Sequence, residues 1–397
     1  MKRRDFLKTS AVTTAVIAAA PFTAQAAEKE KSKVRRYQEI GKTGLKMSDI
    51  SYGTGRLPSS SMILRAIDRG INYFDTAPDY GSAEEYIGGA MKKIQRDKII
   101  IASKFCVPYS YPGHLPPGSK KSDYIKAVEG SLSRMKTDYL DFCFVHAIGE
   151  QSKSKDEEMK RLLSDELFSA VQGLKKTGKM RFLAVSSHGP DNMESLLSEA
   201  VQSGQYDMIM PSFNFLKFPR IPNLLREAKK RGVGVIAMKT LAGAKDMDFD
   251  SKGSAFEPAA FKWVLSHPEV NGLVITIKRV SDLDLYLTAS GEPLTASDRK
   301  VLDLYARHYG KRYCRTGCNE CESDCPKGVS IATTLRYQMY FNDYGMEKHA
   351  MKSYAGLQDC AQPCFICDNE LCVSACPYGL PVSDLLREAH KTLTFTV

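Results

Sequence analysis

The stretch "GINYFDTAPDYGSAEEYIGGAM", residues 70–91, carries the change of pattern that decides the fold. Its first part, "INYFD", is a short apolar run of the length of a buried strand. The loop "TAPDYGS" follows, and the segment after it has the length and composition of a helix. This unit of strand, loop and helix is the one to look for in the rest of the chain.

The same alternation repeats on both sides of this stretch. Amphipathic segments such as "SDYIKAVEGSLSRM" separate apolar runs of strand length, and this order is typical of βαβ units and a parallel sheet. Eight such units over about 250 residues predict a closed (β/α)8 barrel at 37–290. No G-x-G-x-x-G follows the first strand, which disfavours an open dinucleotide-binding sheet. The predicted strands are "SDISYGTG", "INYFD", "KIIIASK", "YLDFCFVH", "MRFLAVS", "YDMIMPS", "VGVIAMK" and "GLVITI".

Composition and charge exclude two classes of function. The chain has 397 residues, 43% of them apolar and 26% charged, which is ordinary for a globular protein. The formal charge of +10 is not gathered into a Lys/Arg stripe with interleaved aromatic residues, so nucleic-acid binding is not expected. No stretch after the N-terminal region reaches 18 apolar residues, so no stable membrane span is predicted.

The N-terminus has the features of an export signal. In "MKRRDFLKTSAVTTAVIAAAPFTAQA", residues 1–26, a basic region containing Arg3 and Arg4 precedes a short apolar core and an A-x-A cleavage site. The paired arginines resemble a twin-arginine signal, whose pathway exports folded proteins. We therefore expect a signal peptide at 1–26, a linker at 27–36 and a periplasmic location.

Four ionisable residues stand where predicted strands run into their loops, which is where barrels collect their chemistry. They are Asp75, Tyr80, Lys104 and His146. A nearby ammonium stabilises a phenolate, a carboxylate keeps that ammonium charged, and a histidine can orient a carbonyl oxygen. Together these groups would protonate an oxygen while hydride reaches its carbon.

The string D-T-A-x-x-Y-G, with the lysine and histidine after it, resembles the aldo-keto reductases. The similarity continues through "IIIASK", "SLSRMKTDYLDFCFVH", "GKMRFLAVSSH" and "GVGVIAMKTLAGA". It implies a (β/α)8 barrel that reduces aldehydes or ketones with NADP(H). In that scheme Tyr80 donates the proton, Lys104 lowers its pKa, Asp75 pairs with Lys104, and His146 orients a small carbonyl substrate.

The resemblance also implies a set of cofactor-binding positions. They correspond to the turn at the nicotinamide ribose, the pair at the carboxamide, the loop over the pyrophosphate and the adenosine phosphate site. Met210 stands where the family has a glutamine, and "ITIKRVSD" differs from the family's phosphate-binding sequence. The candidate residues are Thr54, Gly55, Ser186, Ser187, Met238, Lys239, Leu241, Lys278 and Arg279.

Residues 291–397 contain two cysteine motifs, one spaced C-x3-C-x2-C-x3-C-P and one spaced C-x2-C-x4-C-x3-C-P. Both keep the ending of the bacterial ferredoxin pattern, in which the fourth cysteine can ligate the other cluster. Cys325 would then ligate the cluster held by the second motif, and Cys376 the cluster held by the first. Cys360 is a spare or alternative ligand. The candidate metal ligands are Cys314, Cys318, Cys321, Cys325, Cys364, Cys367, Cys372 and Cys376.

Three interpretations of these cysteines remain open. Disulfides suit an exported protein, and zinc binds four ligands at comparable spacing. The C-P endings and export in the folded state favour two 4Fe–4S clusters in a small α-helical ferredoxin-like module. Such a C-terminal region also occurs in a branch of the aldo-keto reductases. Of the other cysteines, Cys143 lies in a strand and is expected in the core, whereas Cys106 opens a long loop and is a candidate reactive thiol.

Three functions are compatible with these features. The first is an exported, nicotinamide-dependent carbonyl reductase with an iron–sulfur module. The second is an electron-transfer protein that serves a periplasmic redox partner and whose barrel does not use NADPH. The third is a binding or scaffold protein in which the clusters are only structural.

Overall fold

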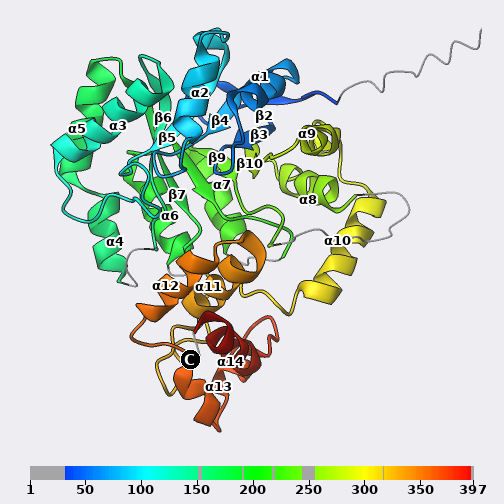
Figure 1. The fold of residues 1–397 in the computed structure, drawn as a ribbon. Helices are drawn as coiled ribbons and strands as arrows, with labels where there is room; N and C mark the ends of the chain where they lie inside the picture. The colour runs from blue at the N-terminus through cyan, green and yellow to red at the C-terminus, as the bar shows by residue number, and fades with distance from the viewer. Residues whose placement is uncertain are drawn as a thin grey trace, which may run out of the picture. The chain divides into compact units, whose positions relative to one another are not determined.

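The computed structural model describes residues 32–150, 154–189, 192–216, 220–243, 255–315 and 317–394. The expected signal peptide at 1–26 and the first part of the linker lie outside this range. Eight parallel strands close a barrel in the order β10-β3-β4-β5-β6-β7-β8-β9, which confirms the predicted (β/α)8 fold (Figure 1). Their bounds are β3 Ile50–Gly53, β4 Tyr73–Asp75, β5 Ile100–Lys104, β6 Leu140–Val145, β7 Met180–Ser187, β8 Met208–Pro211, β9 Gly234–Ala237 and β10 Gly272–Thr276.

The strands divide their side chains between two apolar layers. On β6, Phe142 and Phe144 belong to the cluster inside the barrel, whereas Cys143 and Val145 belong to the cluster between strands and helices. This alternation follows from the two-residue period of a strand. The hairpin of β1 (Tyr37–Glu39) and β2 (Lys46–Ser48) adds Met47 to the inner cluster, so the barrel interior is packed. Cys143 lies in the core, as expected.

The helices of the barrel follow its strands. They are α1 Ser60–Asp68, α2 Ala83–Met91, α3 Lys121–Met135, α4 Lys155–Leu162, α5 Asp165–Lys176, α6 Met193–Ser203, α7 Ile221–Arg231, α8 Phe256–Leu265 and α9 Val280–Tyr286. The helix α10 (Ala296–Tyr309) packs against α8 through Val301, Leu302 and Tyr305. The chain therefore stays on the barrel for one helix beyond residue 290, where the sequence pattern changes.

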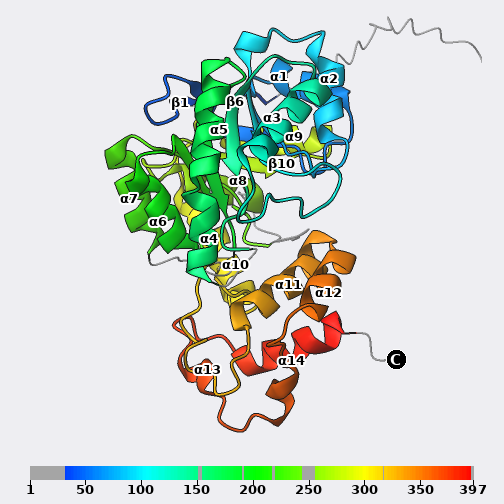
Figure 2. The ribbon, with the colours of Figure 1, turned by 90° about the vertical axis from the view of Figure 1, so that its left-hand side faces the viewer.

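The cysteine-rich part has a core of its own, which contains Ile331, Tyr354 and Leu386. The segment between the two motifs forms two helices, because Gly345 takes a left-handed conformation (φ 60°) and ends the first of them. The first helix packs against α12 and α14 (Figure 2). Residues 32–397 form one compact unit. The helices are α11 Ile331–Tyr344, α12 Glu347–Ala355, α13 Leu371–Ser374 and α14 Val382–Leu393.

We predict that Phe142→Ala destabilises the protein by about 3–5 kcal/mol, because it leaves a cavity inside the barrel. The partly exposed Phe168 on α5 is the matched control, and Phe168→Ala should cost clearly less. Chemical denaturation of both variants measures the difference. Equal losses would mean that the barrel interior is not the packed layer described above.

Candidate functional site

A buried ion pair lies at the carboxyl ends of β4 and β5. The Lys104 Nζ donates hydrogen bonds to both carboxylate oxygens of Asp75, at 2.7 and 2.8 Å, and to the carbonyl oxygen of Thr76 at 2.8 Å. Lys104 is 2% exposed and Asp75 is 5% exposed. All three ammonium protons are therefore used, and the expected pairing of these two residues is present.

Tyr80 lies next to this pair. Its ring centre is 5.1 Å from the Lys104 Nζ, and its ring meets that of His146 edge to face at 6.0 Å. Burial, followed by the carboxylates of Asp75 and Asp79, raises the pKa of Tyr80 well above its ordinary value. That Lys104 lowers this pKa stays a prediction of the family resemblance; here its ammonium group donates to Asp75 and Thr76. In this arrangement the raised pKa leaves Tyr80 as a neutral phenol, and its role as proton donor stays a prediction.

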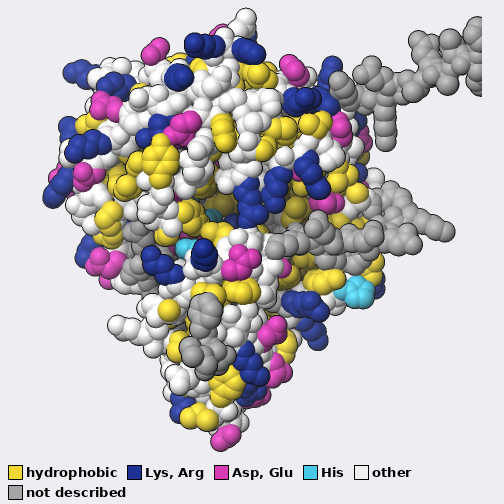
Figure 3. All heavy atoms as spheres, viewed as in Figure 1, with side chains coloured by type: hydrophobic (Ala, Val, Ile, Leu, Met, Phe, Trp, Pro, Cys, Tyr) yellow, Lys and Arg dark blue, Asp and Glu magenta, His cyan; other side chains and the backbone are white. Residues whose placement is uncertain are grey.

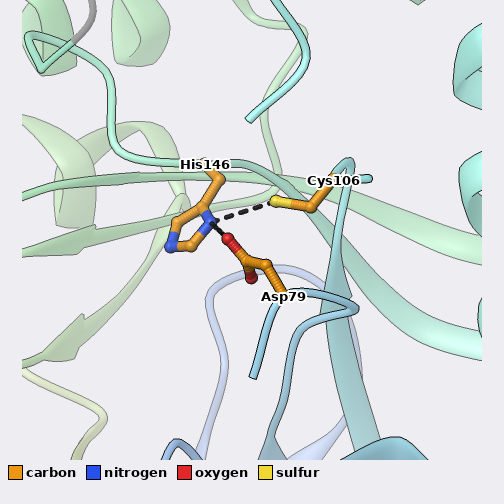
Figure 4. Close-up of side chains that lie close together, drawn as sticks. All are labelled: Asp79, Cys106 and His146. Atoms are coloured by element: carbon orange, nitrogen blue, oxygen red, sulfur yellow. Dashed lines mark hydrogen bonds and ion pairs between the residues drawn. The ribbon is translucent and has the colours of Figure 1, made fainter. Parts of the chain in front are cut away.

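His146 follows β6 and meets two further side chains (Figure 4). Its Nδ1 lies 3.2 Å from the Cys106 Sγ and 3.9 Å from the Asp79 Oδ2. Burial, then the charges of His114 and Lys104, lower the pKa of His146 well below its ordinary value, so the ring is neutral. The four strand-end residues predicted from the sequence are therefore brought together, with Cys106 and Asp79 beside them.

Sequence reasoning missed a ring of histidines around this site. The ring centres of His114 and His146 are 4.3 Å apart, and His188, which follows β7, is close enough to lower the pKa of both. His349 on α12 meets Tyr111 edge to face at 5.3 Å. Four of the seven histidines thus gather here. The sequence did offer one indication of this ring: His188, like the predicted residues, is a polar residue that directly follows a strand.

The helix α11 lies across the carboxyl end of the barrel. Its Tyr340 hydroxyl donates to the Glu150 Oε1 at 3.3 Å, and Arg336 donates to the carbonyl oxygen of His188. The Lys239 Nζ, after β9, is 5.7 Å from the ring centre of Tyr340. One helix of the cysteine-rich part therefore contacts the loops after β6, β7 and β9. The space-filling view shows a hollow in this face with histidine and hydrophobic side chains inside it (Figure 3).

Three of the candidate cofactor residues use their hydroxyl groups within the barrel. The Thr54 Oγ1 donates to the carbonyl oxygen of Asp75 at 2.9 Å. The Ser186 Oγ accepts from the backbone N–H of Ala147 at 3.0 Å, and the Ser187 Oγ donates to the carbonyl of Ile148 at 2.7 Å. All three hydroxyl-bearing residues are buried, so in this arrangement they fasten the loop after β6 and the end of β3.

The remaining candidates are spread along the mouth. Gly55, Lys278 and Arg279 are exposed, and Arg279 Nε donates to the Asp282 Oδ1 at 3.1 Å. Met238 packs beside the inner barrel cluster, and Leu241 packs beside the outer one. Met210, in place of the family's glutamine, is buried inside the barrel.

The cleft between the loops after β8 and β9 is filled by α11 and the chain before it. The cavity left there measures about 20 Å³, which is room for about one water beside the Ser212 hydroxyl. A Cβ at Gly243 would lie 3.3 Å from Tyr313 and 3.6 Å from Met339. In this arrangement α11 and the chain before it occupy the space between the described residues of these loops.

The first set of cysteines is defined by the thiols around Cys314. Burial raises the pKa of the Cys314 thiol, and the neighbouring thiolates of Cys318, Cys321 and Cys376 raise it further. Burial, followed by Cys376 and Cys318, likewise raises the pKa of Cys321 to about 12. Cys314, Cys318 and Cys321 of the first motif thus lie near Cys376, the last cysteine of the second motif.

The second set shows the reciprocal exchange. Burial raises the pKa of Cys364 to about 11, and its thiolate neighbours are Cys325, Cys372 and Cys367. Burial and the same Cys325 raise the pKa of Cys372. Cys325 of the first motif is thus a neighbour of Cys364 and Cys372, as Cys376 of the second motif is of Cys314 and Cys321, and Cys372 also lies near Cys321. Cys360 instead neighbours the Tyr354 hydroxyl.

The spacing of these sulfur atoms separates the three interpretations. All eleven cysteines are free thiols, so no disulfide is formed. A tetrahedral zinc ion at 2.3 Å from each sulfur would hold the sulfurs about 3.8 Å apart. Within the described chain, which includes every cysteine, no three sulfurs lie within 4.8 Å of one another. In this arrangement, neither set of described cysteines converges on a single tetrahedral zinc position.

A second cavity, of about 500 Å³, lies beside the first cysteine set and not at Tyr80. Its lining includes Cys318, Tyr378, Glu194, Glu320 and Arg220. Arg220 forms ion pairs with both of these glutamates. The cavity therefore lies where α6 and the start of α7 meet both cysteine motifs, and none of the four strand-end residues lines it.

Lys239 predicts a pH dependence of the contact between α11 and the barrel. Burial, then the charge of Arg336, lowers the pKa of Lys239 in the folded protein to about 7. Between pH 7 and the ordinary pKa of lysine, the unfolded chain therefore binds more protons at this residue than the folded chain does. Stability should therefore rise with pH over that window, by at most about 1.4 kcal/mol per pH unit. Hydrogen exchange of α11 from pH 6.5 upward measures it. Lys239→Met should remove this rise and the exposed Lys278→Met should keep it, whereas equal profiles in all three proteins would contradict it.

Comparison with known proteins identifies the barrel. The sequence profile of the aldo/keto reductase family matches residues 50–257, which ends before the cysteine-rich part. The profile of the twin-arginine translocation pathway signal sequence matches residues 1–20, outside the described residues, and indicates export from the cytoplasm. Among the helices that the structure describes, none is long and apolar enough to cross a membrane.

Several characterised proteins are similar to this chain. L-glyceraldehyde 3-phosphate reductase of Escherichia coli K12 is 28% identical over 225 residues, which cover 52% of this chain and 62% of that protein. L-galactose dehydrogenase of Arabidopsis thaliana is 25% identical over 291 residues, covering 64% and 87%. The 6-dehydroglucose reductase of Novosphingobium aromaticivorans is 27% identical over 273 residues, covering 58% and 83%. The match thus spans less than two thirds of the Escherichia coli enzyme.

Solved structures share the fold. An aldo-keto reductase of Bacillus halodurans in its holo form superposes with a TM-score of 0.54 at 22% identity, covering 69% of this chain and 96% of that one. A putative aldo-keto reductase of Pseudomonas aeruginosa gives 0.53 at 22% identity, covering 66% and 96%. The barrel, the strand-end residues and the profile match agree: the chain belongs to the aldo/keto reductase family.

Proposed function

We propose that this chain is an exported oxidoreductase that interconverts a hydroxyl and a carbonyl group next to Tyr80, with two 4Fe–4S clusters as its electron carriers. The observation that carries the proposal is the position of Cys314. This first cysteine of the first set lines the same small cavity as Ser212 and Lys239 of the barrel mouth. An inorganic group on that set would therefore adjoin the barrel, where electrons can reach the site.

The donor sets suit iron–sulfur clusters. Cys314, Cys318, Cys321 and Cys376 would hold one cluster, and the other four motif cysteines would hold the second, consistent with the neighbours given above. When bound, such clusters pass electrons one at a time between a protein site and a redox partner. We infer that the partner is a periplasmic electron carrier, since the signal sequence indicates export.

The acid–base part of the reaction rests on the chain's own residues. Tyr80 holds a proton on its phenol oxygen, and the Asp75–Lys104 pair keeps a fixed dipole beside it. The neutral His146 ring lies next to Tyr80 and can orient the substrate oxygen. The contacts of Tyr340 and Arg336 with the barrel loops limit the entry of water. Reduction of a carbonyl at this site would take two electrons, one from each reduced cluster, and two protons, one from the Tyr80 phenol to the oxygen and one from water to the carbon. In the oxidation of a hydroxyl group the two electrons would pass to the clusters, and the two protons to the Tyr80 phenolate and to water.

The substrate class follows from the relatives. The names of the three similar enzymes refer to a triose phosphate, a hexose and an oxidised glucose. We therefore propose a sugar or sugar derivative, with its reacting hydroxyl or carbonyl at Tyr80.

Nicotinamide is the competing electron source, because the family typically uses NADP(H). Its use here would require α11 to leave the cleft and Ser186 and Ser187 to release their backbone partners. The present contacts favour the clusters instead. A protein that only transfers electrons remains the second candidate, and the closed barrel mouth is the observation that favours it.

The direct test is oxidation of sugars by the cluster-loaded protein under anaerobic conditions, with no nicotinamide present. A substrate should bleach the visible absorbance of the oxidised clusters, and Tyr80→Phe should slow this by about 100-fold or more, because the proton relay is lost. Tyr86→Phe, on the surface of α2, should react like the unchanged protein.

Three results would contradict this proposal. If bleaching or turnover occurred only after addition of NADP+, the clusters would not be the primary electron acceptor. If Tyr80→Phe and Tyr86→Phe reacted equally, the barrel site would not perform the proton chemistry. Micromolar binding of NADPH to the unchanged protein would equally show that α11 does not close the cleft.

The crossed cysteine sets make a separate prediction. Cys376→Ser should remove the same electron paramagnetic resonance signal as Cys318→Ser, although the two lie in different motifs. Each variant should fall from about eight to about four iron atoms per chain, as expected for two four-iron clusters. Cys360→Ser is the control and should keep both signals. If Cys376→Ser instead removed the signal that Cys367→Ser removes, Cys376 would ligate the cluster of its own motif, and the proposed exchange of cysteines between motifs would be wrong.

A further inference from the structure

Three side chains at the barrel mouth converge on one point. The Cys106 Sγ, the His146 Nδ1 and a carboxylate oxygen of Asp79 all lie within 4.8 Å of one another (Figure 4). Cys106 is 1% exposed, His146 3% and Asp79 5%. From these residues we propose that this protein binds a zinc ion between Asp79, Cys106 and His146. The proposal does not depend on the iron–sulfur clusters or on the electron route.

The distances between the ligand atoms match a tetrahedral metal centre. Zinc binds sulfur at about 2.3 Å and nitrogen or oxygen at about 2.0–2.2 Å. These lengths place a sulfur and a nitrogen ligand about 3.6 Å apart, and a nitrogen and an oxygen about 3.4 Å apart. The separations here are 3.2 Å and 3.9 Å. Small side-chain movements would bring all three atoms onto one ion.

The geometry does not fit a Cys-His-Asp nucleophilic triad. In such a triad the thiol and the carboxylate bind opposite nitrogens of the imidazole ring. Here Cys106 and Asp79 both approach the same Nδ1, and the other ring nitrogen points away from them (Figure 4). Only one proton can lie at Nδ1, and the Cys106 thiol, which is also a hydrogen-bond partner of the Asp79 carboxylate, can supply only one more to this group of three. A cation between three lone-pair donors serves all of them.

Asp79 supplies an independent observation. Its Oδ2, which faces His146, accepts from the backbone N–H of Gly113 at 3.0 Å, and the Cys106 thiol is a further hydrogen-bond partner of the carboxylate. The buried Oδ1 is left without a hydrogen bond in the described part of the chain. A buried carboxylate with an oxygen left without a partner is costly and needs an explanation. A divalent cation would compensate its charge together with that of the Cys106 thiolate.

The loop after β5 is built to hold the thiol in place. Cys106 forms a β-bridge with His114, and the backbone N–H of Val107 donates to the carbonyl of Gly113. A Cβ at Gly113 would lie only 2.4 Å from the Val107 carbonyl oxygen, so the loop is tightly closed. The same loop therefore positions Cys106 and orients Asp79, as an outer shell does for metal ligands.

The ligand set favours zinc and a reactive role. A thiolate, an imidazole and a carboxylate together suit this borderline ion better than magnesium or calcium, which prefer oxygen. Three protein ligands are typical of catalytic zinc sites, where water or a substrate oxygen takes the fourth position. A substrate oxygen bound there would lie beside Tyr80, whose ring is 6.0 Å from that of His146.

The test uses the full chain with its clusters intact, washed with a chelator and then given zinc sulfate alone. Zinc K-edge X-ray absorption does not detect the iron and should report about one zinc per chain with one sulfur and two or three nitrogen or oxygen ligands. Cys106→Ala and Asp79→Ala should each weaken zinc binding at least about 10-fold. Cys143→Ala, at another buried cysteine of the barrel, should bind zinc normally.

Iron content and circular dichroism show whether each variant is folded, and zinc should raise the melting temperature of the unchanged protein and of Cys143→Ala only. Less than about 0.1 zinc per chain after loading would overturn the proposal. Zinc with sulfur ligands alone would also overturn it, because that signal places the ion in the cysteine-rich part. Unchanged binding in Cys106→Ala would do the same. None of these results bears on whether the clusters carry electrons.

Discussion

The buried ion pair between Lys104 and Asp75 is the constraint around which the barrel mouth is organised. Neighbouring strands β4 and β5 place the two side chains together, and removing either partner would leave an uncompensated buried charge, a loss of about 3–5 kcal/mol. The pair is tolerated because each ammonium proton has an acceptor. With this charge neutralised, Tyr80 and His146 can both be buried in their neutral forms.

The helix α11 covers the barrel mouth for a similar reason, because buried polar groups of the loops need hydrogen-bond partners. The tyrosines and Arg336 of that helix satisfy groups of the loops after β6, β7 and β9, and the cleft between β8 and β9 shrinks to about one water. Ser186 and Ser187 are meanwhile held by backbone groups. These groups therefore hold the mouth in its present form. Under the function proposed above, a cluster on the first cysteine set would lie against this mouth.

Sequence pattern predicted the barrel well because each strand and helix has its own hydrophobic period. The residues at strand ends could be identified for the same reason. Asp75, Lys104 and His146 stand where the apolar pattern of a strand ends and a loop begins. Tyr340 could not be found this way, because it reaches His188 across 152 positions of the chain. The division between α11 and α12 depends on one left-handed residue, Gly345, which no hydrophobic period records.

The sequence by itself determined the eight strands, the four strand-end residues and the two cysteine motifs, since local spacing encodes all of these. Only the tertiary structure decided which cysteines are neighbours, which hydroxyl groups are already bonded and which helix covers the mouth. Asp79, Cys106 and His146 likewise come together only when β4, β5 and β6 align. The physical reason is that burial and hydrogen-bond partners depend on segments far apart in the chain, which no local period records.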